Sequence, residues 1–139
     1  MYLRFVCGHR HPYLDAELGI YNAAHFIWLE DQPAWLIAAY EDAFGVLYGM
    51  VEPECVSDFS QTRDGRLSLC WVRAERRDLV TGFRYLAWAM TELGVPIGEI
   101  RTTDPGRILY RDRDQIVAQP NRGRVPKCFP RLRHAPRAR

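Results

Sequence analysis

Residues 101–120, RTTDPGRILYRDRDQIVAQP, decide the fold class of this 139-residue chain. Asp104-Pro105-Gly106 is a turn signal, because proline fixes φ at one corner position and glycine accepts a positive φ at the next. The RDRD sequence at 111–114 forms a second polar reversal. The apolar groups beside these turns predict a three-stranded antiparallel meander, with its charges in the turns and on the solvent face.

An apolar stripe upstream of the meander predicts a helix over residues 79–93. Its members recur at the 3.6-residue spacing of an amphipathic helix, and Gly94 followed by Pro96 is a typical helix end. The stripe consists of Leu79, Phe83, Leu86, Met90 and Leu93.

Two more helices are predicted in the first half of the chain. From Asp15 onward, apolar residues recur at the i, i+3, i+4 spacing of an amphipathic helix and predict a helix over residues 15–29. A second helix over residues 31–50 has Asp31 as its expected cap and Pro33 in its first turn, where a missing N–H costs little.

Residues 2–7 and 67–73 are rich in β-formers and predict two central strands. The whole pattern predicts an α+β fold, with a single mostly antiparallel sheet of about five strands and about three helices packed on one face. Residues 1–120 form the expected domain, and the Arg/Pro-rich residues 121–139 form a C-terminal tail that has the composition of a linker or of an arm that becomes ordered on binding.

Composition excludes several classes of protein. The hydrophobic share of 47% excludes a disordered chain, and no apolar run reaches the ~20 residues of a membrane span. The start of the chain lacks a signal-peptide pattern, so we expect a cytoplasmic protein with reduced thiols, no membrane contact and no cofactor.

Charge is unevenly distributed although the net charge is +2. Residues 1–61 contain nine acidic and two basic residues, whereas residues 119–139 contain seven basic residues and no acid. Such a division suits electrostatic steering towards a charged partner.

Cys7, His9 and His11 are the most tempting chemical cluster. Zinc sites pair two such ligands with a second pair, which this chain lacks, so no metal site is assigned. The sequence also lacks the common hydrolase, metalloprotease and phosphate-loop motifs, so no catalytic residue is assigned. A Cys/His enzyme or metal protein stays an alternative.

The chain resembles a group of small bacterial proteins of uncharacterised function over residues 1–120. The likeness rests on the MYLRFV start, the CWVR strand at 70–73, the LGVP segment at 93–96 and the DPGRILY and DQIVA segments of the closing hairpin. This resemblance implies no activity and carries over no functional residue.

The leading hypothesis is a small non-enzymatic accessory or regulatory protein that docks on a protein partner. The expected contact surfaces are an acidic helical pair and a basic face of the meander, formed by Glu30, Asp31, Glu41, Asp42, Arg101, Arg107, Arg111 and Arg113. A homodimer is an alternative partner. Nucleic acid bound by the tail is another, through the phosphate contacts of Arg122, Arg124, Lys127, Arg131 and Arg133.

Overall fold

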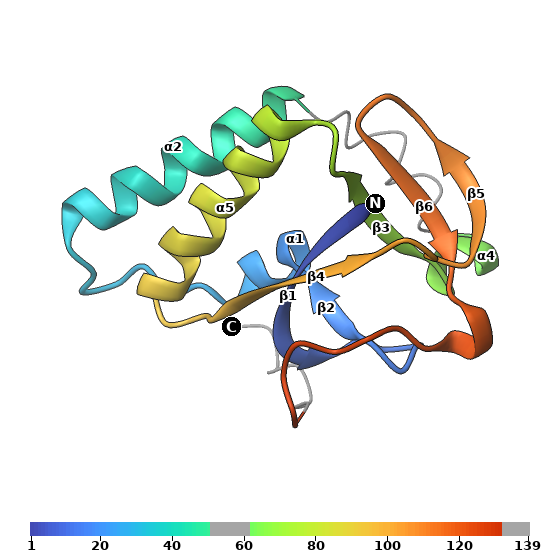
Figure 1. Cartoon of the computed structure of the whole chain (residues 1–139). Coiled ribbons are helices and arrows are strands. Elements are labelled where there is room, and N and C mark those ends of the chain that lie inside the picture. The colour runs from blue at the N-terminus through green and yellow to red at the C-terminus, as the bar shows by residue number, and fades with distance from the viewer. Residues whose placement is uncertain (51–61, 132–139) are drawn as a thin grey trace.

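The computed structural model describes residues 1–50 and 62–131 and places its two long helices on one side of a six-stranded sheet (Figure 1). Its elements in chain order are β1 (Tyr2–Arg10), β2 (Glu17–Gly19), α1 (Ile20–Ala23), η1 (Ala24–Phe26), α2 (Ala34–Met50), α4 (Arg63–Arg66), β3 (Leu69–Arg73), α5 (Arg77–Glu92), β4 (Ile97–Thr102), β5 (Arg107–Arg111), β6 (Gln115–Gln119) and η2 (Asn121–Gly123).

The strand order is β2-β1-β3-β6-β5, with β4 paired to β1 off this path. Tyr2 faces both Arg73 and Thr102, and Val6 faces both Gly19 and Gly98. One edge of β1 therefore pairs with β4, while β3 and β2 share the other edge. All of these strand pairs are antiparallel, which confirms the α+β class and the central position of β1 and β3.

The predicted three-stranded meander is wrong in one strand. β5 and β6 form the expected hairpin, but β6 then pairs with β3, and β4 pairs along Tyr2 to Cys7 of β1. The turn signal at Asp104 correctly marks a chain reversal. The turn signal does not specify which strand pairs with β4, the strand that precedes the turn.

The predicted helix over residues 15–29 is also wrong. Glu17–Gly19 form β2, and only Ile20–Ala23 are α-helical before the short η1. Ala16, Glu17 and Leu18 are all buried, a run that the one-sided burial of a surface helix cannot produce.

The helices α2 and α5 confirm the two longer helical predictions. They pack side by side against one face of the sheet (Figure 1), and the whole predicted stripe of α5 is buried. Asp31 adopts a φ of 64° and lies outside α2, while Pro33 accepts the first amide bonds of the helix from Leu36 and Ile37. The structure describes α2 as far as Met50.

A second apolar cluster covers the opposite face of the sheet. It contains Trp71 and Ile116, with Val125 and Phe129 from the C-terminal segment packed against it. The Phe129 ring lies against β1 at Gly8, where an added Cβ would be in ordinary van der Waals contact with it at 3.5 Å. Residues 121–131 therefore belong to the packed structure, and the linker interpretation does not describe them.

The described helices include none that is long and apolar enough to cross a membrane.

Candidate functional site

Three aromatic side chains form an exposed cluster on α2 and α5. Trp35 is 62% exposed, Trp88 46% and Tyr85 39%. The Trp35 and Trp88 ring centroids are 6.5 Å apart, and those of Tyr85 and Trp88 are 6.2 Å apart. Large exposed aromatics that contact one another across two helices are unusual on a solvated surface and are typical of interaction sites. We call these three residues the aromatic cluster.

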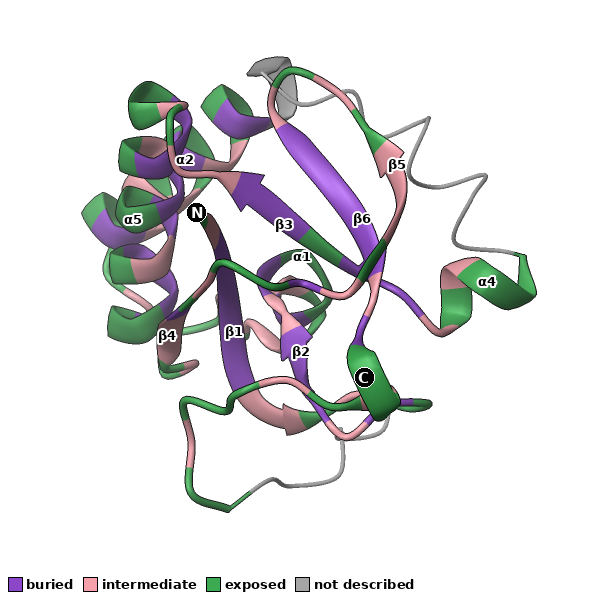
Figure 2. Cartoon of the chain, turned by 45° about the vertical axis from the view of Figure 1, so that its right-hand side comes forward, coloured by how far each residue is buried: buried purple, intermediate pink, exposed green. Residues whose placement is uncertain are grey.

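The aromatic cluster exists because α5 is apolar on two sides. One side packs Leu79, Phe83 and Leu86 into the core, and the outward side carries Tyr85 and Trp88 one turn apart. Figure 2 shows the same division, with buried positions on the inner side of both helices and exposed positions on the outer side.

Acidic residues accompany this surface. Glu41 and Asp42 are the only charged residues of α2, and both are exposed. Asp42 shares a helix face with Trp35, because the two are seven residues, about two turns, apart. Glu30 and Asp31, in the segment before α2, are exposed as well. The four acidic residues predicted to bind a partner therefore all lie at the surface on or next to α2.

The four predicted arginines are also exposed but do not form one surface. Arg107 and Arg111 lie at opposite ends of β5, whereas Arg101 lies on β4, which pairs with a different strand. Arg101 also hydrogen bonds to Glu99 at 3.1 Å. The basic face expected from the meander therefore does not exist as a continuous patch.

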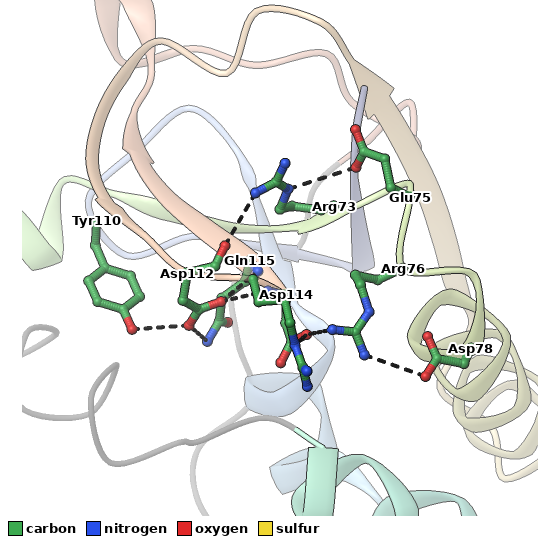
Figure 3. A network of polar contacts seen from close by, with 9 residues as sticks. Arg73, Glu75, Arg76, Asp78, Tyr110, Asp112, Asp114 and Gln115 are labelled. Atoms are coloured by element: carbon green, nitrogen blue, oxygen red, sulfur yellow. Dashed lines mark hydrogen bonds and ion pairs between the residues drawn. The ribbon is translucent and has the colours of Figure 1, made fainter.

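Arg113 belongs to the turn between β5 and β6. The two acidic side chains of this turn, Asp112 and Asp114, are both engaged by neighbouring groups (Figure 3). Asp112 accepts hydrogen bonds from the backbone N–H groups of Asp114 and Gln115 at 2.8 and 2.9 Å and from the Tyr110 hydroxyl at 3.0 Å. Partial burial would raise the pKa of Asp112, but these hydrogen bonds outweigh it and lower the pKa overall.

The same turn is tied to the start of α5. Arg76 forms ion pairs with Asp114 and with Asp78 (Figure 3), and the Arg76 and Asp114 side chains are only 22% and 14% exposed. Mutually satisfied charges of this kind stabilise a turn and leave no convergent set of free groups for catalysis. We therefore interpret the RDRD turn as structural.

The basic residues of the tail divide into two groups. Lys127 Nζ lies 2.8 Å from Asp15 Oδ1, and Arg124 lies 3.8 Å from the other oxygen of the same carboxylate. The hydrogen bond from Lys127 is the main reason why the pKa of Asp15 is lowered. Arg122 and Arg131 are exposed, and Arg133 lies outside the described residues.

The Cys7, His9 and His11 side chains do not converge. Cys7 is buried in the core beneath the helices, His9 packs edge-on against Phe26, and His11 accepts hydrogen bonds from two backbone N–H groups. Burial raises the pKa of the Cys7 thiol, which disfavours a reactive thiolate. Across residues 1–50 and 62–131, no group of three or more His, Cys, Asp or Glu side chains could hold a metal ion.

Sequence reasoning did not include the aromatic cluster among the candidate residues. A signal for two of its members was present, because Tyr85 and Trp88 fall off the apolar stripe of α5 and so must face away from the core. Trp35 had no comparable signal, since α2 is apolar around most of its circumference.

No family model, no curated protein and no solved structure matches this chain.

Proposed function

We propose that this chain is a protein-docking module whose aromatic cluster binds a basic segment of a protein partner. The observation that carries the proposal is the exposed contact of Trp35, Tyr85 and Trp88 across α2 and α5. Tryptophan and tyrosine dominate the binding energy of protein interfaces, because they bury much apolar area and still offer a polar group.

Charge complementarity supports a basic partner. The exposed charges of α2 are both negative, and Glu30 and Asp31 precede the same helix. Arg84 of α5 is already engaged by Glu99, with hydrogen bonds of 2.8 and 3.2 Å. A partner segment with apolar side chains for the aromatic cluster and Lys or Arg side chains around them fits this surface.

The test is an affinity capture from nuclease-treated host lysate with the wild type and a Trp35→Ala/Trp88→Ala variant. Tyr13→Ala is the matched control, because it removes an exposed aromatic on the loop between β1 and β2. A stoichiometric protein with a basic segment, retained by the wild type and the control but lost by the double variant, supports the proposal.

Two outcomes contradict it. If the double variant captures the same proteins as the wild type, the aromatic cluster is not the docking surface. If sedimentation shows a wild-type dimer that the double variant abolishes, the surface is occupied by a second copy of the chain instead.

A further inference from the structure

A hollow of about 440 Å³ lies where β5 starts, next to α4. In Figures 1 and 2, α4 lies on the side of the molecule away from α2 and α5, so the hollow is separate from the aromatic cluster. The residues that line the hollow are Leu14, Leu67, Arg107, Gln119, Pro120, Asn121, Arg122 and Gly123. This described lining includes two arginines and no acidic residue.

A hydrogen bond holds the Arg107 guanidinium group. Arg107 donates to the Gln119 side-chain oxygen at 2.8 Å, which uses one of its five N–H donors and leaves the others for a ligand. Its neighbour Gly106 has a φ of 99°, and a Cβ there would lie 2.1 Å from the Gln119 carbonyl oxygen. The backbone at Gly106 therefore packs directly against Gln119, which fixes the backbone position of the neighbouring Arg107.

The second guanidinium comes from an unusual backbone position. Arg122 has a φ of 57°, in the left-handed region that residues other than glycine rarely adopt. Backbone hydrogen bonds from Gly123 to Pro120 and from Arg124 to Asn121 hold this turn. Two arginines on one hollow are the usual means of binding a phosphate group, because guanidinium donors match its oxygens in pairs.

The acid beside the hollow is already engaged. Asp104 accepts from the Gly106 N–H at 3.2 Å and from the Asn121 amide at 3.1 Å, with a different oxygen in each bond. It therefore orders the Asn121 side chain, whose second amide hydrogen stays available to a ligand.

An exposed aromatic residue and a further arginine are the chain neighbours of two residues that line the hollow. Tyr13 is 58% exposed, and the Arg66 guanidinium carbon lies 6.0 Å from its ring centroid. Their chain neighbours Leu14 and Leu67 both line the hollow. An exposed ring beside cationic side chains is the arrangement with which proteins stack an unpaired base next to its phosphate.

We propose that this hollow binds a nucleoside phosphate unit, with Arg107 and Arg122 on the phosphate and Tyr13 against the base. The site is independent of the docking function proposed above. A free nucleotide and a single-stranded nucleic acid present the same unit, and the experiment distinguishes these two sources.

The test measures binding of adenosine monophosphate and of a labelled oligothymidylate of about ten nucleotides to the full chain. Arg107→Gln/Arg122→Asn removes both charges, with asparagine chosen because it tolerates the left-handed backbone. Arg111→Gln is the matched control, since it removes an exposed arginine from the other end of β5. Tyr13→Ala and Tyr13→Phe test the stacking.

The double variant is expected to bind about tenfold or more weakly, and Tyr13→Ala about fivefold or more, while Tyr13→Phe and Arg111→Gln stay near the wild type. Tighter binding of the oligonucleotide, with a salt dependence that the double variant reduces, identifies a single strand as the source. Equal affinity for the mononucleotide identifies a free nucleotide.

Wild-type protein that binds neither probe at about 50 mM salt overturns the proposal. So does an Arg111→Gln variant that loses half or more of the binding free energy lost by the double variant, because one charge against two would then explain the whole effect. Unchanged affinity in the Tyr13→Ala variant overturns the proposed stacking of Tyr13 against the base.

Discussion

The Glu17 carboxylate accepts a hydrogen bond of 2.8 Å from the backbone N–H of Phe129, 112 residues further along the chain. Its other oxygen accepts from the N–H of Cys128, also at 2.8 Å. Glu17 is fully buried, and the buried Arg4 guanidinium donates to its backbone carbonyl. Burial lowers the pKa of Arg4 to about 10, so this group is still positively charged at neutral pH. The C-terminal segment is thus joined to β2 through a single buried carboxylate.

Glu17→Ala should lower the free energy of unfolding by about 3 kcal/mol, because two buried N–H groups lose their acceptor and each unsatisfied group costs about 1–3 kcal/mol. Glu17→Gln should cost less, since its amide oxygen still accepts one bond. Urea denaturation measures both. Glu75→Ala is the control, because the Glu75 side chain is 64% exposed. A Glu17→Ala variant as stable as this control would contradict the account.

Gly98→Ala should displace the C-terminal segment from β4. A Cβ at this position would lie 2.2 Å from Cys128 Sγ and 3.0 Å from Cys128 Cβ. We expect a loss of about 1–3 kcal/mol, as for other overpacked sites, and faster proteolysis after residue 124. Adding Cys128→Gly removes both clashing atoms. If this second change does not improve on Gly98→Ala alone, the close approach of the two residues is refuted.

His11 should make stability depend on pH in the weakly acidic range. Its Nδ1 accepts from the N–H groups of Tyr13 and Leu14, and burial, followed by the charge of Arg4, lowers its pKa from 6.5 to about 4. The unfolded chain therefore takes up this proton first as pH falls. The contribution of His11 is complete above pH 6.5 and is lost progressively towards pH 4.

Unfolding by urea at several pH values, with an NMR titration of the His11 ring, checks this prediction. His11→Asn is the control, because an asparagine oxygen can accept the same backbone bonds without titrating in this range. A folded-state midpoint near 6.5 for His11 would show that the ring does not accept these bonds.

The ion pair between Arg76 and Asp114 should stabilise the junction of α5 with the β5–β6 turn. Both side chains are mostly buried, so a double-mutant cycle with Arg76→Ala and Asp114→Asn should give a coupling energy of about 2 kcal/mol. Arg113 lies 3.4 Å from the same carboxylate but is 80% exposed. Its replacement by alanine should cost no more than about 0.5 kcal/mol. A coupling energy between Arg76 and Asp114 no larger than the cost of Arg113→Ala would contradict the role of burial.

Local patterns predicted the parts of the fold that local interactions determine. The stripe of α5 and the turn at Asp104 were sufficient because helix burial and turn geometry depend on neighbouring residues. The pairing of β4 with β1 was missed because it joins residues that are about 90 to 100 positions apart, from Cys7 with Ile97 to Tyr2 with Thr102. The role of Glu17 was missed for the same reason. Its place in the sequence is typical of an acid in the first turn of a helix, but its hydrogen-bond donors are the distant N–H groups of Cys128 and Phe129.

The candidate surface was predicted only in part. The acidic residues around α2 could be identified because charge is visible in the sequence. Tyr85 and Trp88 could be recognised as outward-facing, but the cluster itself could not be predicted, since its formation requires that α2 and α5 lie side by side with Trp35 next to Trp88.

The most direct test of the docking function is the dissociation constant of the captured partner, measured with purified protein by calorimetry. Trp35→Ala and Trp88→Ala should each weaken binding about 30-fold, and the double variant up to about 1,000-fold, because each interface anchor contributes about 2 kcal/mol. Glu41→Gln/Asp42→Asn should weaken it less, and mainly at low salt. An unchanged dissociation constant in a correctly folded Trp35→Ala/Trp88→Ala variant would contradict the central claim.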